Sequence, residues 1–220
     1  MLTAAFKNTK PYRIITGAED NSIIISEGPP FRFQSNKKEH SNFVSCIKFN
    51  PDYTLFASVG FDKKINIWDA AENQVLYSFD SSTPNMHTAS IIYVVWIDKS
   101  TLATVSVDKT VKVWDLDAKS VKYTLYPLDK ASLGEPQVGC GLAYSDSLKL
   151  LISLTLDGKI NVWEVEKLCE DKGPDFVVHG HQSSVTHVRY AKAVDKLVSI
   201  DNQGKISNLK FLFINFNFYF

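Results

Sequence analysis

The chain consists of short segments of β-branched and aromatic residues that turn-forming residues separate. Apolar side chains recur four, seven and nine residues after three of its histidines, in runs that begin at Val44, Ile91 and Val185. Turn formers follow, such as Asn-Pro-Asp at 50–52 and Asp-Gly at 157–158. Segments of this length and composition are typical of β-strands bounded by turns. The pattern therefore predicts an all-β protein.

A repeat with a period in the forties organises these segments. Three similar phrases, KKINIWDA, KTVKVWDL and GKINVWEV, share a tryptophan; an aspartate stands six residues before it, and a serine or threonine four residues before the aspartate. The three sets are Ser58, Asp62 and Trp68; Thr104, Asp108 and Trp114; and Ser153, Asp157 and Trp163. This period, with Gly-His and Trp-Asp pairs, is typical of the four-stranded blade of a WD-repeat β-propeller.

Weaker copies of the repeat stand at both ends of the chain. Thr16 and Asp20 begin one copy, and near the other end Ser199 keeps the hydroxyl while Gln203 replaces the aspartate. The sequence predicts an incomplete WD-repeat propeller of about four and a half four-stranded blades over residues 1–209, the first blade lacking its upstream strands. The expected blade hairpins lie around Asp20, Asp62, Asp108, Asp157 and Gln203.

The last eleven residues, Lys210–Phe220, break the pattern with five phenylalanines among Leu, Ile, Asn and Tyr. An edge strand and a translated intron or frameshift are the alternatives, and we expect residues 210–220 to form an aberrant or disordered apolar tail. Repeat arrays need capped or closed ends. We therefore expect the chain to be part of a longer protein or a truncated product.

Histidines precede most of the hydroxyl–aspartate pairs, whereas Glu135 stands at that position in the remaining blade. We expect a hydrogen-bond chain from aspartate through histidine and hydroxyl to tryptophan, because buried polar groups need partners and a satisfied network fixes one geometry. The predicted network residues are His40, Ser58, Asp62, Trp68, His87, Thr104, Asp108, Trp114, Ser153, Asp157, Trp163, His181 and Ser199.

The set His40, Ser58 and Asp62 also matches the residue types of a serine hydrolase triad. A catalytic site occurs once, however, whereas this set recurs from blade to blade, so no catalytic residue is predicted and the protein is not expected to be an enzyme. The run 179–181 (His-Gly-His) has no further ligand at metal-binding spacing, and no glycine-rich phosphate motif is present. Neither a metal nor a cofactor is expected.

Charge and composition narrow the range of partners. The formal net charge is zero, with 24 basic and 24 acidic residues, which argues against nucleic acid as the main partner. No apolar run reaches the length of a membrane span, no secretory signal is present, and three scattered cysteines are typical of a reduced intracellular protein. We expect a cytoplasmic protein whose partners are proteins, without a membrane or small-molecule substrate.

Some phrases are more specific than the general repeat. They are PYRIITGAEDN at 11–21, EGPPFRF at 27–33, Glu39-His40, Phe43-Val44 and FNPD at 49–52. Together they resemble the first propeller of the actin-interacting protein 1 family, and the similarity runs from about Phe6 to Lys210.

The resemblance implies a protein with two linked seven-bladed propellers that binds cofilin-decorated actin filaments and promotes their disassembly without catalysis. It also implies a place in the actin cytoskeleton. An acidic residue and two aromatics that contribute to actin–cofilin binding in the family fall on Glu19, Phe33 and Phe43. Packing of both aromatics between neighbouring blades is the alternative. The other function class is a generic WD-repeat scaffold, such as a ubiquitin-ligase substrate receptor.

Overall fold

The computed structural model describes residues 2–126, 138–155, 159–179, 181, 183, 185–191 and 196–209. These residues form five antiparallel sheets, called blades 1 to 5 in chain order. Blade 1 contains β1 (Thr3–Lys7), β2 (Tyr12–Gly17), β3 (Ile23–Gly28) and β4 (Arg32–Lys37). Blade 2 contains β5 (Val44–Phe49), β6 (Leu55–Gly60), β7 (Ile65–Asp69) and β8 (Gln74–Phe79). Blade 3 contains β9 (Ile91–Trp96), β10 (Thr101–Ser106), β11 (Val111–Asp115) and β12 (Ser120–Leu125). Blade 4 contains β13 (Val138–Ser145), β14 (Leu150–Thr155), β15 (Lys159–Glu164), the short 3-10 helix η1 (Val165–Lys167) and β16 (Phe176–His179). Blade 5 contains β17 (Val185–Ala191), β18 (Lys196–Asp201) and β19 (Ile206–Leu209).

Each blade is a meander in which every strand pairs with the next one along the chain. The incomplete all-β propeller is therefore confirmed. The expectation that the first blade lacks upstream strands is wrong, because β1 pairs along its whole length with β2, from Thr3 opposite Gly17 to Lys7 opposite Arg13. The three-stranded blade of the described residues is blade 5.

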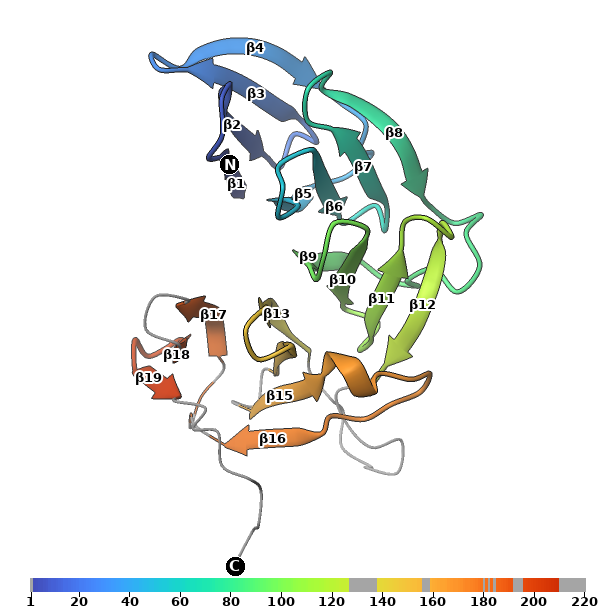
Figure 1. The fold of residues 1–220 in the computed structure, drawn as a ribbon, viewed down its shortest axis with the longest axis vertical. Helices are drawn as coiled ribbons and strands as arrows, with labels where there is room; N and C mark the ends of the chain where they lie inside the picture. Colours follow the sequence, from blue (N-terminus) through green and yellow to red (C-terminus); the bar gives the residue numbers. More distant parts are fainter. Residues whose placement is uncertain are drawn as a thin grey trace, which may run out of the picture.

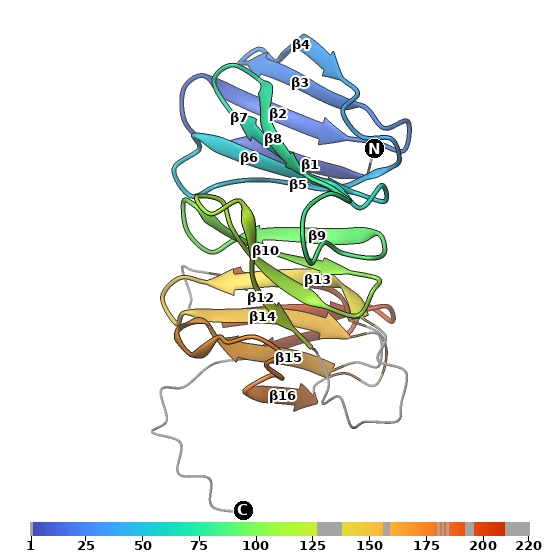
Figure 2. The same cartoon turned by 90° about the vertical axis from the view of Figure 1, so that its right-hand side faces the viewer.

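The blades follow one another around an arc, with the first strand of each blade on the inside (Figure 1). The inner strands β1, β5, β9, β13 and β17 are neighbours in succession. Seen from the side, the sheets lie as successive layers (Figure 2). Among the described residues, no helix is long and apolar enough to cross a bilayer.

The core lies between adjacent blades. Between blades 2 and 3, for example, the ring of Phe79 packs 4.8 Å from that of Trp114, within a buried cluster that both sheets supply. This packing explains the sequence pattern. The third strand β7 is covered on both faces and carries a nearly continuous run of buried residues, whereas the outer strand β8 alternates exposed and partly buried positions.

Blades 3 and 4 are also joined at the rim. The connection from β15 to β16 leaves its own sheet and lies beside β12, where Leu125 and Lys172 form a parallel bridge. Asp171 donates its backbone N–H to the Thr124 carbonyl at 2.9 Å, and Thr124 donates its own to the Glu170 carboxylate at 2.8 Å. The outer edge of blade 3 is thus paired with a segment of the next blade.

Four features named from the sequence lie outside the described residues: Asp157, Glu135, Gly180 of the His-Gly-His run, and the tail at 210–220.

Candidate protein-binding face

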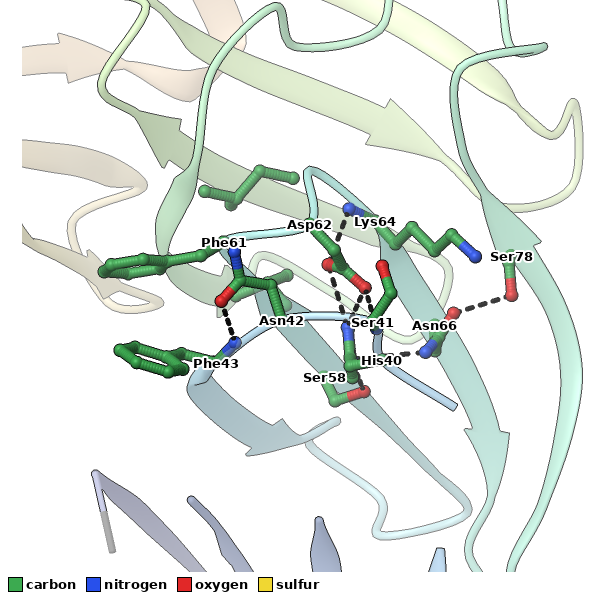
Figure 3. A network of polar contacts seen from close by, with 12 residues as sticks. His40, Ser41, Asn42, Phe43, Ser58, Phe61, Asp62, Lys64, Asn66 and Ser78 are labelled. Carbon is green, nitrogen blue, oxygen red and sulfur yellow. Dashed lines mark hydrogen bonds and ion pairs between the residues drawn. The ribbon is translucent and has the colours of Figure 1, made fainter. Parts of the chain in front are cut away.

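A buried hydrogen-bond chain holds the turn of blade 2 (Figure 3). His40 Nδ1 lies 2.9 Å from Asp62 Oδ2, and His40 Nε2 lies 2.8 Å from Ser58 Oγ. The Asp62 carboxylate accepts hydrogen bonds only, so Nδ1 carries the proton and Nε2 accepts from Ser58. Trp68 Nε1 then donates to Ser58 Oγ at 2.9 Å, and the side-chain amide of Asn66 lies 3.2 Å from His40 Nε2. Asn66 is a member of this chain that the repeat pattern did not single out.

The Asp62 carboxylate also fixes the backbone on both sides of it. It accepts the N–H of Ser41 at 3.0 Å and that of Lys64 at 3.1 Å. Burial by itself raises the pKa of Asp62, but the hydrogen bond from His40 and those from these amides outweigh it, and the pKa lies below its ordinary value. The carboxylate therefore stays ionised and ties the turn after β6 to the connection that precedes β5.

Blade 3 repeats this geometry with threonine in place of serine. His87 lies 2.8 Å from both Asp108 and Thr104, and Trp114 donates to Thr104 at 2.8 Å. Burial lowers the pKa of His87, which keeps the imidazole neutral. Burial opposes ionisation of Asp108, yet its hydrogen bonds from His87, Thr110 and the Thr88 amide bring its pKa down to about 2.

In blade 5 the histidine has a partner that the spacing did not predict. His181 Nε2 lies 2.7 Å from Ser199 Oγ, but His181 Nδ1 lies 3.0 Å from Asp201. Gln203 nevertheless occupies the turn position of Asp62, because Gly204 donates to the Asp201 carbonyl as Lys63 donates to the Gly60 carbonyl; the bond to the histidine has passed to Asp201. Asp201 ends β18, and its carboxylate reaches the same place from the strand because the turn folds back over it, with the amides of Gln203 and Lys205 donating to Asp201 Oδ1.

Blade 4 does not reproduce the chain. Ser153 Oγ, Trp163 Nε1 and both polar atoms of the Asn161 side chain are buried without a hydrogen-bond partner among the described residues. The expected bond between Ser153 and Trp163 is thus not formed. For Asn161 the physical reason is its neighbour, because Val177 pairs with Asn161 where Ser78 bonds Asn66 in blade 2.

The contacts of His40, Ser58 and Asp62 do have the connectivity of a nucleophile, base and orienting carboxylate. The hydroxyl is nevertheless fully buried and already accepts the Trp68 indole N–H. A nucleophile needs an open approach to its substrate. The arrangement therefore holds the turn and leaves the Ser58 hydroxyl without access to a substrate.

The turns and connections that these histidines hold share one face of the molecule. In a four-stranded meander the second and fourth strands run in the same direction, so the turn after the second strand and the connection after the fourth emerge together. We call this the turn face: residues 18–22, 38–43, 61–64, 80–90 and 107–110. The Val44 amide donates to the Ala18 carbonyl at 3.2 Å, which links the two segments between blades 1 and 2.

Two of the three residues singled out by resemblance lie on the turn face. Glu19 is exposed in the turn between β2 and β3, and Phe43 is 38 % exposed in the connection between β4 and β5. Phe33 lies elsewhere. It stands near the start of the outer strand β4, opposite Ser26 and four residues from the Lys37 end that meets the turn face, and it is 66 % exposed. Neither aromatic ring is buried between blades.

Phe61 is a further aromatic residue on the turn face that the repeat analysis passed over. It stands immediately before the turn aspartate Asp62, and its ring lies 5.6 Å from that of Phe43, centroid to centroid. An aromatic residue in a turn is the signal that would have identified it.

Comparison with known proteins identifies relatives of this chain. The model of the WD domain, G-beta repeat, matches residues 32–69 and 79–115. Actin-interacting protein 1 of Drosophila melanogaster is 31 % identical over 94 % of the chain and 32 % of its own length. Actin-interacting protein 1-2 of Arabidopsis thaliana is 35 % identical over 94 % of the chain and 33 % of its own length. WD repeat-containing protein 1 of Mus musculus is 37 % identical over 81 % of the chain and 28 % of its own length. The chain spans about a third of the length of these relatives.

Proposed function

Because the chain is a partial member of the actin-interacting protein 1 family of WD-repeat proteins, we propose that it is a non-catalytic module that binds actin filaments and promotes their disassembly together with cofilin. The observation that carries the proposal is the match to proteins named for actin interaction over nearly the whole chain. The proposed place of action is the cytoplasmic actin cytoskeleton, and the proposed partners are actin filaments and cofilin.

Exposed side chains on blades 1 and 2 stand on a backbone that hydrogen bonds hold in place, which supports this proposal. Phe43 follows directly on the connection that His40 and Asp62 hold, and its own amide is bonded to the Asn42 side chain at 2.8 Å. Aromatic anchors with fixed backbones lose little entropy on binding. We propose Glu19 and Phe43 as contacts on the turn face and Phe33 as a contact on the outer strand, so that the filament is met at two sides of blade 1.

Co-sedimentation of the purified, monodisperse chain with actin filaments, with and without cofilin, tests the proposal. We expect more of the chain to pellet when cofilin is present. Alanine variants of Glu19, Phe33 and Phe43 are compared with Leu76→Ala, a control on the outer strand β8 whose side chain is 53 % exposed. A folded chain that stays in the supernatant under both conditions contradicts the proposed function.

A further inference from the structure

We propose that Phe61 is a second aromatic anchor of the turn face, which joins Phe43 in a docking site for a filament segment that carries an apolar side chain flanked by carboxylates. The inference rests on the proposed function and adds a residue and a partner chemistry to it. Phe61 and Phe43 are 37 % and 38 % exposed, and their ring planes are tilted by 35°. Both rings point to the same side, away from the His40–Asp62 pair (Figure 3).

The backbone beneath the two rings is fixed. The Phe61 amide donates to the Phe43 carbonyl at 2.9 Å, and the Ser90 hydroxyl donates to the Phe61 carbonyl at 3.3 Å. Gly60 permits this close approach, because a Cβ at that position would lie 2.7 Å from the Phe43 carbonyl oxygen. The two aromatic side chains are therefore presented as one preorganised pair. Such a pair is suited to receive an apolar side chain with little loss of conformational entropy.

The charges around the pair indicate the flanking chemistry of the partner. The carboxylate of Asp62 is only 2 % exposed because it faces His40, whereas Lys63, the next residue, is exposed. The turn of blade 3 has the same order, with Val107 56 % exposed, Asp108 turned inward and Lys109 partly exposed. The turns of blades 2 and 3 therefore present apolar side chains and ammonium groups while their aspartates are buried.

Acidic groups also lie on the turn face. Glu19, Asp20 and Glu39 belong to blade 1, where Lys38 lies near Asp20, and Asp80 lies near Lys64 and is bonded to Ser82. Lys63 adjoins Phe61 in the chain, and Lys109 stands at the equivalent position of the blade 3 turn, so ammonium groups border the apolar side chains of both turns. A segment with carboxylates next to an apolar residue is complementary to them in both shape and charge.

Two variants test the inference by co-sedimentation with cofilin-decorated filaments. Phe61→Ala is expected to weaken binding at least about five-fold, the range of an anchor residue. Lys63→Asn removes one charge and keeps a residue type that tolerates the left-handed backbone at this position, φ 67°. It is expected to weaken binding about two-fold or more at low salt and to make the affinity less dependent on salt.

Leu76→Ala serves as the exposed apolar control, and melting temperatures establish that each variant is folded. If Phe43→Ala weakens binding while Phe61→Ala and Lys63→Asn bind like the original chain, the inference is wrong and the proposed function stands. If the original chain does not pellet with the filaments, both are overturned.

Discussion

Replacing His40 by alanine should destabilise the protein strongly, because the imidazole joins three buried groups. The change removes contacts to Asp62, Ser58 and Asn66, at 2.9, 2.8 and 3.2 Å. Loss of a partner for a buried carboxylate costs roughly 1.5–3 kcal/mol, and each neutral bond about 1 kcal/mol. Ser58 keeps the Trp68 donor and Asp62 keeps two amides, which limits the expected total to about 3 kcal/mol.

For a chain of this size that loss corresponds to a fall in Tm of roughly 6–12 °C. Urea denaturation followed by circular dichroism measures the free energy of unfolding, and His187→Ala is the matched control because His187 is exposed on β17. The control should change the free energy by less than about 0.5 kcal/mol. A double-mutant cycle of His40→Ala with Asp62→Ala should show a coupling energy of about 1 kcal/mol or more. A His40→Ala variant as stable as the control would refute the view that the network fixes the blade.

Three further perturbations have defined outcomes. Acid should destabilise the protein, because the folded state holds His87 neutral and Asp108 ionised with a pKa of about 2, so the unfolded state binds more protons. The free energy of unfolding should therefore fall as the pH drops from about 6.5 to 2. Urea midpoints at pH 7, 5 and 3 that do not decline, or a dependence on pH that is unchanged in Asp108→Asn, would contradict this. Gly60→Ala should lower stability by about 1–3 kcal/mol, because its Cβ would meet the Phe43 carbonyl, and a thermal melt like that of the original chain would show that the turn can yield. Arg13→Met should lower the urea midpoint by an amount equivalent to about 2 kcal/mol, since the guanidinium bonds Glu27 within blade 1 and the Ala70 and Ala71 carbonyls of blade 2; Lys10→Met, a change at an exposed side chain, is its control.

The propeller and the chains of blades 2 and 3 could be predicted from the sequence because fixed spacing carries fixed geometry. The segment from a hydroxyl residue to an aspartate four residues later covers the end of one strand and the start of the turn that follows, as from Ser58 to Asp62. The spacing did not give the partner of His181 in blade 5, where Asp201 stands only two residues after Ser199 and reaches the histidine from the strand end. Spacing identifies the position of a residue along the backbone, but not the position of its side-chain oxygen.

The strand β1 escaped prediction for a different reason. Its sequence, TAAFK, has one β-branched residue, one aromatic residue and two alanines, and it alternates partly buried with exposed positions. Its place is secured by pairing with β2 and by Lys7, a buried lysine whose ammonium bonds the Thr9 carbonyl at 3.3 Å. Backbone pairing of this kind leaves a weak trace in the pattern of apolar residues.

The surface was the least predictable part. Glu19, Phe33 and Phe43 are close in the sequence, yet Phe33 lies on an outer strand while the other two share the turn face. Proximity along the chain does not report the face of a sheet. Phe61 lies next to Phe43 only because the turn of blade 2 meets the connection from blade 1, a long-range contact that no local pattern encodes.

The segment of blade 4 that lies along β12 has a mechanical consequence. Neighbouring blades that touch only through their packed faces can tilt relative to each other. Blades 3 and 4 are also fastened at the rim through Glu170, Asp171 and Lys172, so opening this pair requires backbone bonds to break far from the inner strands. Blades 3 and 4 should therefore move as one rigid body, because force on either blade is transmitted to the other at both the inner and the outer edge.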